Sequence, residues 1–264
     1  EEMAIPPIKN ISDIRAMGKE VVSKGYTALK TNIFLFDGKP RLHIPGFSLV
    51  EEFPALNAEQ SITQAIRLQL EAFREGTGPE IDILVDLNFN FKTEGFLKMA
   101  RTMQPFNLLW VEIDSRNPEA LHYIRQGTTI PLASGECLFG RRDYKSYLEN
   151  QSMDIAIIDV PWNGIAESLK IASLAEIYEV NVAPHNFYSH LSTFMSAHFS
   201  SVVANFRIME IDVDTVPWYN DLVTVKPHID QGYLHLPDGP GWGTEVNEEA
   251  VLAHPPKVNQ WKFS

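Results

Sequence analysis

The sequence has few cysteines, few basic residues and no long apolar run. Its one cysteine, Cys137, excludes a disulfide within the chain and is typical of a reducing compartment. Lys and Arg number 22 against 34 Asp and Glu, which gives a formal net charge of −12. Nucleic-acid and anionic-membrane binders usually carry the opposite sign, so we expect neither kind of partner. No run approaches the roughly 18 consecutive apolar residues that a membrane-spanning helix needs.

A secretory signal and the common nucleotide-binding motifs are also missing. Residues 1–7 have neither the positive nor the apolar region of a signal peptide, so we expect a cytoplasmic protein. The first residue is not Met, and we therefore expect the chain to begin within a longer protein. No Gly-x-Gly-x-x-Gly follows a strand pattern and no P-loop motif occurs, so the sequence carries no motif evidence for a dinucleotide-binding or P-loop fold.

What is present is an alternation of short apolar runs with segments of helical length. The 264 residues are 44% apolar, ordinary for one large globular domain or two small ones. The runs suit strands that are buried on both faces of a parallel sheet, so the pattern predicts an α/β fold, either an open sheet or a (β/α)8 barrel. The predicted strands are 26–29, 81–85, 108–111, 130–133, 155–160, 180–183 and 208–211, and the predicted helices are 58–75 (capped by Asn57), 92–103, 164–178 and 187–203.

Two segments depart from the alternation. Residues 34–56 are rich in Gly and Pro and form a longer connection than usual, which is often a functional feature. Residues 217–264 are predicted to be an ordered irregular C-terminal segment, with Trp242 and Tyr233 as apolar anchors. We expect residues 1–264 to form a single barrel domain that includes this segment.

A polar, chemically capable side chain stands near the end of each later strand. These residues are Asp86, Glu112, Glu136, Asp159, His185 and Glu210, at intervals of 23 to 26 residues. In a barrel such strand ends converge on one face, where active sites lie. A single carboxylate there is more often solvated or a helix cap, and His185 taken alone fits an ordinary satisfied histidine. Six such polar residues at regular intervals favour an active site over six unrelated strand ends.

The convergence predicts a cation and a histidine base. Carboxylates gathered at one barrel mouth repel each other unless a cation lies among them, and hard oxygen ligands favour Mg²⁺ over zinc. His185 and Asp159 fall on neighbouring strands, the arrangement in which a carboxylate orients an imidazole base. Lys30 ends the first strand and belongs to the same set, although a lysine that reaches the rim for solvation fits its position equally well.

The ordered set of motifs resembles the enolase superfamily, in particular its mandelate racemase-like group with acid-sugar dehydratases. The matching pieces are Gly25-Tyr-Thr-Ala-Leu-Lys30, Val85-Asp86-Leu-Asn88, Val111-Glu112, Ser134-Gly135-Glu136, Ile158-Asp159-Val160 with Gly164 and Glu167, Ala183-Pro184-His185-Asn186, and Met209-Glu210. They extend from about residue 11 to about residue 242. The resemblance covers the barrel portion of that superfamily.

The resemblance implies a site and a reaction. It implies Mg²⁺ held by Asp86, Glu112 and Glu136, a catalytic set of His185, Asp159, Glu210 and Lys30, and Asn32 and Asn88 as substrate-binding residues. In this set His185 and Asp159 form the base and Glu210 is a hydrogen-bonding electrophile. The family abstracts a proton α to a carboxylate and holds the enediolate on the metal.

Three departures from the family pattern shape the expectation. Lys30-Thr31-Asn32 stands where the racemases have Lys-x-Lys, so a one-base reaction suits the sequence better than a two-base racemisation. Trp162-Asn163-Gly164 replaces the usual Gly-Gly after the sixth strand. The first barrel strand and the N-terminal α+β capping domain are not visible, so we expect a (β/α)7β-type barrel completed by an upstream segment.

The leading hypothesis is an enzyme that dehydrates an acid sugar, an aldonate or aldarate, to a 2-keto-3-deoxy acid. The alternatives are an epimerase, a racemase or a lactone cycloisomerase of the same superfamily, or a non-catalytic scaffold fragment. The expected partners are a small carboxylate substrate and further copies of the chain in a homo-oligomer.

Overall fold

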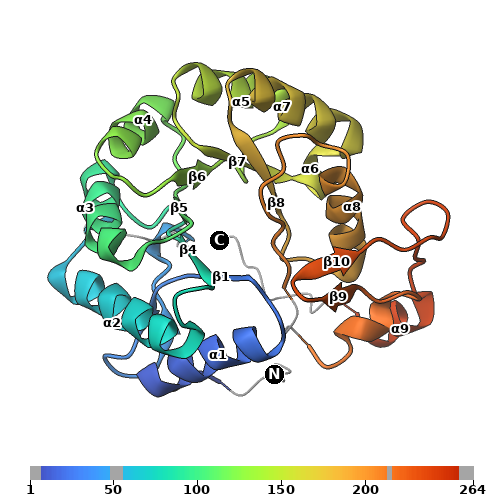
Figure 1. The fold of residues 1–264 in the computed structure, drawn as a ribbon, viewed down its shortest axis with the longest axis horizontal. Helices are drawn as coiled ribbons and strands as arrows, with labels where there is room; N and C mark the ends of the chain where they lie inside the picture. The colour runs from blue at the N-terminus through green and yellow to red at the C-terminus, as the bar shows by residue number, and fades with distance from the viewer. Residues whose placement is uncertain (1–6, 48–55, 213–215, 256–264) are drawn as a thin grey trace.

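Six parallel strands curl into one sheet with helices on its outside (Figure 1). The computed structural model describes residues 7–47, 56–212 and 216–255. The order across the sheet is β1-β4-β5-β6-β7-β8, so each strand pairs with the next barrel strand along the chain. These strands are β1 (Ala28–Thr31), β4 (Asp82–Asp86), β5 (Trp110–Glu112), β6 (Leu132–Ser134), β7 (Ile155–Asp159) and β8 (Asn181–His185).

The helices cover the convex face of the sheet, as Figure 1 shows. Two of them, residues 118–126 and 140–149, lie between strands where the sequence analysis named no helix. The helices are α1 (Ile11–Ser23), α2 (Gln60–Thr77), α3 (Thr93–Met103), α4 (Pro118–Gln126), α5 (Gly140–Glu149), α6 (Val160–Asn163), α7 (Ile165–Ile177) and α8 (His190–Ser200), with a single 3-10 turn, η3 (Gln104–Phe106), after α3.

Alternation along the strands divides the core in two. Ile83 and Val85 pack toward the helices, whereas Leu84 between them joins a smaller cluster inside the curled sheet. Trp110 and Ile157 belong to the same inner cluster. Successive strand residues point to opposite faces, so a strand buried on both sides needs a continuous apolar run. This double burial is why the short apolar runs identified the strands.

The predicted α/β fold of parallel strands is confirmed, with element ends displaced by a few residues. Helix α2 begins after Glu59, which makes no side-chain cap, so the predicted cap at Asn57 is wrong. Within the described ranges, none of the helices has the length and apolar character needed to cross a bilayer.

The predicted strand at 208–211 is wrong as a strand. The chain meets β8 there through one parallel bridge, Val182 with Phe206, and through the Arg207 amide that donates to the Val182 carbonyl at 2.9 Å. Among the described residues no backbone bond joins this segment to β1, and β1 and β8 are the sheet edges. One bridge with two flanking hydrogen bonds is too short a ladder to make a strand, and it lies before residue 208. The upstream strand that would lie between β1 and the segment of Glu210 stays a prediction. Residues 1–5 could supply this strand instead, and they lie outside the described residues.

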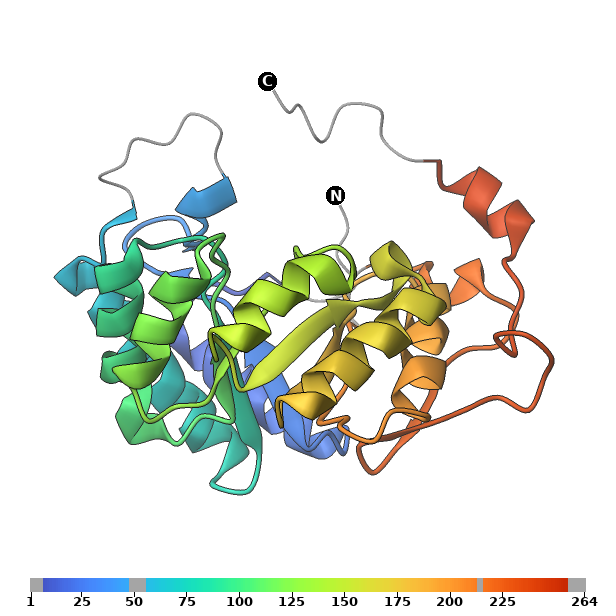
Figure 2. The same cartoon turned by 90° about the horizontal axis from the view of Figure 1, so that it is seen from above.

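The two segments outside the alternation contain short elements. The first holds β2 (Phe34–Leu35) paired with β3 (Arg41–Leu42) and the turn η1 (Pro45–Phe47). The C-terminal segment holds η4 (Tyr219–Leu222), the hairpin of β9 (His228–Asp230) and β10 (Tyr233–His235), and α9 (Glu248–Ala253), which lie together at one side of the sheet (Figures 1 and 2). Tyr233 is 74% exposed, so it is not the expected anchor. The Trp242 ring does pack, 5.8 Å from that of His198.

Helices α1 and α2 approach closely through glycines. A Cβ at Gly76 would lie 2.3 Å from the Arg15 carbonyl oxygen, and one at Gly18 would lie 3.1 Å from the Gly76 Cα. Because backbone surrounds both positions, no side-chain movement can relieve such a contact. The pair of glycines therefore fixes how closely α1 packs against α2.

Gly76→Ala should destabilise the protein by about 1–3 kcal/mol, because the added methyl overpacks the α1–α2 contact. Urea denaturation followed by circular dichroism measures the change. Gly38→Ala is the control, since nothing lies within 4 Å of a Cβ built there. Equal stability of the two variants would show that the helices separate at no cost.

Candidate active site

The polar strand ends meet at one rim of the sheet because the strands are parallel and in register. Asp86 pairs with Glu112 across β4 and β5, and Asp159 pairs with His185 across β7 and β8. Glu136 follows β6 between these two pairs. The carboxyl ends of neighbouring parallel strands share one edge, so residues far apart in sequence become neighbours there.

Three of these residues form a buried carboxylate cluster. Asp86, Glu112 and Glu136 each offer an oxygen, and the three oxygens lie within 4.8 Å of one another. Each residue is at most 8% exposed. Asn88 orients Asp86: its backbone amide donates to Oδ1 at 2.8 Å and its side-chain amide donates to Oδ2 at 2.9 Å.

Lys30 reaches into this cluster from β1. Its Nζ lies 3.1 Å from Glu112 Oε2, 3.7 Å from Asp86 Oδ2 and 2.8 Å from Glu210 Oε1. Burial alone would lower the pKa of Lys30, but the negative charges of Glu112, Glu210 and Asp86 outweigh it and hold the pKa well above its usual value. Lys30 therefore carries a proton, and it acts here as a fixed positive charge.

The carboxylate cluster fits a divalent cation. Burial, followed by the charge of Asp114, raises the pKa of Glu136 to about 8, and burial raises that of Glu112 well above its usual value. Glu112 Oε1 and Glu136 Oε2 are buried without a hydrogen-bond partner. Lys30 balances only one of three negative charges, so a hard divalent ion such as Mg²⁺ would satisfy both the charge and the free oxygens.

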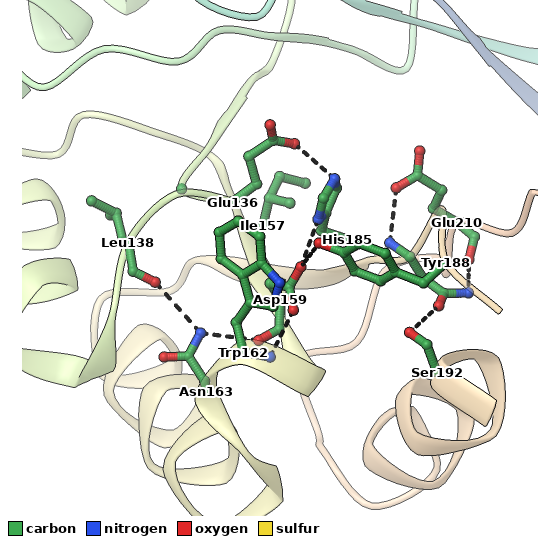
Figure 3. A network of polar contacts seen from close by, with 12 residues as sticks. Glu136, Leu138, Ile157, Asp159, Trp162, Asn163, His185, Tyr188, Ser192 and Glu210 are labelled. Carbon is green, nitrogen blue, oxygen red and sulfur yellow. Dashed lines mark hydrogen bonds and ion pairs between the residues drawn. The ribbon is translucent and has the colours of Figure 1, made fainter. Parts of the chain in front are cut away.

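Opposite the carboxylates lies a histidine paired with an aspartate (Figure 3). His185 Nδ1 is 2.8 Å from Asp159 Oδ2. The same oxygen accepts a hydrogen bond from the Tyr188 hydroxyl at 2.7 Å, and Asp159 Oδ1 accepts from the Trp162 amide at 2.8 Å. A carboxylate with three donors has a fixed direction, so it fixes the tautomer and the plane of the imidazole.

The other imidazole nitrogen faces the carboxylates. His185 Nε2 lies 3.2 Å from Glu136 Oε2. Burial alone would lower the pKa of His185, but the hydrogen bond that Nδ1 donates to Asp159 and the charges of Glu136 and Glu210 outweigh it and raise the pKa. The result is a more basic imidazole that points at the same place as the carboxylate cluster.

Glu210 lies on the open side of the sheet and is held from one side by Asn186 and from the other by Lys30. Its Oε2 accepts the Asn186 backbone amide at 3.0 Å, and Oε1 faces Lys30. Burial alone would raise the pKa of Glu210, but the charges of Lys30 and His185 and these hydrogen bonds lower it. Glu210 is thus an ionised acceptor, and the electrophilic role that the resemblance implies would require it to take up a proton.

Asn32 and Asn88 bond to each other. The Asn32 amide nitrogen donates to Asn88 Oδ1 at 2.9 Å and to the Asp86 carbonyl at 3.1 Å. The side-chain amide of Asn88 donates in turn to Asp86 Oδ2. The structure thus brings both residues to the rim, and these contacts orient Asp86; the substrate contact that the sequence suggested stays a prediction.

Sequence reasoning missed Asp114 and Tyr188. Asp114 is 3% exposed and stands two residues after Glu112, so the period of two along an extended chain could have found it. Tyr188 lies in the loop after β8, and its carbonyl accepts a hydrogen bond from Tyr219 of the C-terminal segment. No local pattern links Tyr188 to Asp159, so the sequence holds no signal for it.

The chain belongs to the Enolase C-terminal domain-like family. Residues 13–250 match the family described as Enolase C-terminal domain-like. Within it the chain is a mandelate racemase-like member of the enolase superfamily, because its relatives are sugar acid dehydratases and its structural neighbours are mandelate racemase/muconate lactonizing enzyme-like proteins. This agrees with the resemblance drawn from the strand-end motifs.

Two curated relatives illustrate the match. D-xylonate dehydratase of Haloferax volcanii is 30% identical over 188 residues, which are 70% of this chain and 46% of the relative. D-gluconate dehydratase of Thermoproteus tenax is 27% identical over 237 residues, 88% of this chain and 44% of the relative. The chain therefore spans less than half the length of these two relatives.

Solved structures match over nearly the whole chain. A Burkholderia xenovorans protein described as a candidate L-alanine-DL-glutamate epimerase, bound to magnesium and fumarate, is 44% identical. Its TM-score is 0.93, and the match covers 97% of this chain and 64% of that one. A mandelate racemase/muconate lactonizing enzyme-like protein of Rubrobacter xylanophilus is 29% identical with a TM-score of 0.82, covering 97% and 64%.

Mg²⁺ affinity should rise with pH. Ligation requires an ionised carboxylate, and the pKa of Glu136 lies at about 8, so binding near neutral pH must release a proton. Isothermal titration calorimetry in two buffers of different ionisation enthalpy measures both affinity and proton release. Glu136→Gln is the matched variant and should bind more weakly and release fewer protons, since the pKa of Glu112 is raised as well. An affinity that is independent of pH would contradict the assignment.

Proposed function

We propose that this protein abstracts a proton α to a carboxylate with the help of Mg²⁺ and dehydrates an acid sugar to a 2-keto-3-deoxy acid. It would be a carbon–oxygen lyase of the hydro-lyase class. One observation carries the proposal: His185 Nε2 faces the cluster of Asp86, Glu112 and Glu136, at 3.2 Å from Glu136. A base and an anion-stabilising centre that share one position are what α-proton abstraction needs.

His185 is the proposed base. Its Nδ1 proton is held by Asp159, so Nε2 is left to take the substrate proton, and Asp159 stabilises the imidazolium that forms. The Tyr188 hydroxyl and the Trp162 backbone amide both donate to Asp159 (Figure 3), and this fixed carboxylate keeps the imidazole from turning.

Mg²⁺, when bound at the carboxylate cluster, would supply the positive charge that stabilises the enediolate. Asp86, Glu112 and Glu136 would hold it, and Asn88 keeps Asp86 in the orientation for this. Lys30 adds a second positive charge beside Glu112, favourable for a substrate carboxylate.

Dehydration needs only one base. His185 takes the α-proton, and the electron pair of the broken C–H bond passes into the carboxylate to give the enediolate. The pair then returns to form the Cα=Cβ bond as the β-hydroxyl takes a proton from the imidazolium and leaves as water. The enol then becomes the 2-keto acid. Lys30 is engaged in ion pairs with three carboxylates and Asn32 cannot act as a base, so the described residues favour this one-base course over a two-base racemisation.

The substrate class rests on the relatives. Two of them are a D-xylonate and a D-gluconate dehydratase, and 30% and 27% identity supports an aldonate as the first substrate to try. We further propose a cytoplasmic homo-oligomer and a capping segment that completes the site.

Epimerisation is the second candidate, and a specific observation favours it. The Burkholderia xenovorans protein described as a candidate L-alanine-DL-glutamate epimerase is 44% identical, more than either dehydratase. An epimerase would exchange the α-proton without forming a ketone, so product analysis separates the two reactions.

His185→Asn should abolish exchange of the substrate α-proton with deuterium and leave Mg²⁺ affinity near that of the wild type. Asparagine keeps a hydrogen-bonding group but removes the base. Proton NMR in deuterium oxide measures exchange, and calorimetry measures Mg²⁺ binding. If exchange persists, another base such as Lys30 removes the proton.

Acid sugars incubated with the protein and Mg²⁺ should give a 2-keto product, detected with a carbonyl reagent. D-xylonate and D-gluconate are the first substrates, followed by other aldonates and aldarates. His185→Asn is the inactive control. If the α-proton exchanges and no ketone forms, epimerisation becomes the better proposal. If neither exchange nor ketone is detected, the result favours the non-catalytic scaffold.

A further inference from the structure

A second group of metal-ligand side chains lies beside the carboxylate cluster. Asp114 follows β5, two residues after Glu112, and Cys137 follows Glu136 directly after β6. One ligand atom from each of Asp114, Glu136 and Cys137 lies within 4.8 Å of the other two. The proposed mechanism uses Glu136 but neither Asp114 nor Cys137.

Asp114 supplies an independent indication that something binds there. It is 3% exposed, and its Oδ2 is buried without a hydrogen-bond partner. A buried carboxylate oxygen that makes no bond is costly, and such groups usually have a partner or coordinate a metal. The carboxylate is directed at Glu136 and at the thiol, because these are the groups within ligand distance of it.

We propose that Asp114, Glu136 and Cys137 form a second cation site that takes a thiophilic divalent ion such as Zn²⁺ or Cd²⁺. Cysteine sulfur and carboxylate oxygens are ordinary zinc ligands, and a solvent molecule completes a four-coordinate shell. Mg²⁺ prefers oxygen ligands alone, so the thiol separates this site from the neighbouring one. As the sulfur–metal bond forms, the thiol proton passes to solvent.

The accessibility of the three ligands suits entry of an ion from solvent. Cys137 is exposed, whereas Asp114 and Glu136 are buried behind it. An ion can meet the sulfur first and then the carboxylates. Since Glu136 belongs to both clusters, a thiophilic ion would draw on a carboxylate that the proposed Mg²⁺ site requires.

The test is titration of the purified protein with Cd²⁺, followed by the ultraviolet absorption of the cadmium–thiolate bond. We expect one Cd²⁺ per chain. Asp114→Asn should weaken binding by at least about tenfold, since loss even of an outer-shell partner often costs that much. Cys137→Ser should remove the absorption. The readout needs no turnover, so it fails or succeeds independently of the proposed reaction.

Asp82→Asn is the matched control, because it makes the same change at an exposed aspartate that begins β4, at the other end of the sheet. It should bind Cd²⁺ as the wild type does. Glu136→Gln is a second ligand variant, expected to weaken binding as Asp114→Asn does, and it serves if Asp114→Asn fails to fold. The proposal is overturned if the wild type gives no cadmium–thiolate absorption, or if the ligand variants bind as tightly as the wild type, which would mean a lone surface thiol.

Discussion

The organisation of the site depends on the mutual repulsion of carboxylates that the parallel strands bring to one buried rim. Asp86, Glu112 and Glu136 cannot all stay ionised at close range without positive charge, and burial strengthens the effect. Lys30 supplies one charge from the first strand, and Asn88 fixes one carboxylate with two hydrogen bonds. The residual negative charge suits this rim to a cation, since buried strand ends are not solvated as exposed ones are.

Much of this arrangement could be predicted from the sequence, for a physical reason. Asp86, Glu112 and His185 interrupt or end runs that are apolar because both faces of the strand are buried, and parallel strands align their ends. A local pattern therefore fixed a three-dimensional neighbourhood. The same logic failed at 208–211, where the apolar run forms no strand and the chain makes one bridge to β8 just before it, at Phe206.

The parts of the site that the sequence did not predict depend on contacts between residues far apart in the chain, which no local pattern encodes. Tyr188 bonds to Asp159 across 29 residues, and Asn32 reaches Asn88 across 56. The sequence marked Asn32 as a missing lysine and as a substrate-binding residue, whereas its contacts show how it supports Asp86 through Asn88. Tyr233 was chosen as an anchor for its size, yet it lies on an exposed hairpin edge, because an aromatic residue on a short strand can face either side.

The bond between Tyr219 and the Tyr188 carbonyl connects the irregular C-terminal segment to the orientation of His185. Tyr188 holds Asp159, and Asp159 holds the imidazole of His185, so the direction of that ring depends on a residue outside the sheet. A segment that adds no strand to the sheet thereby limits the rotation of the imidazole. Natural variation in that segment would then change how firmly the imidazole is held while the side chains at the strand ends stay the same.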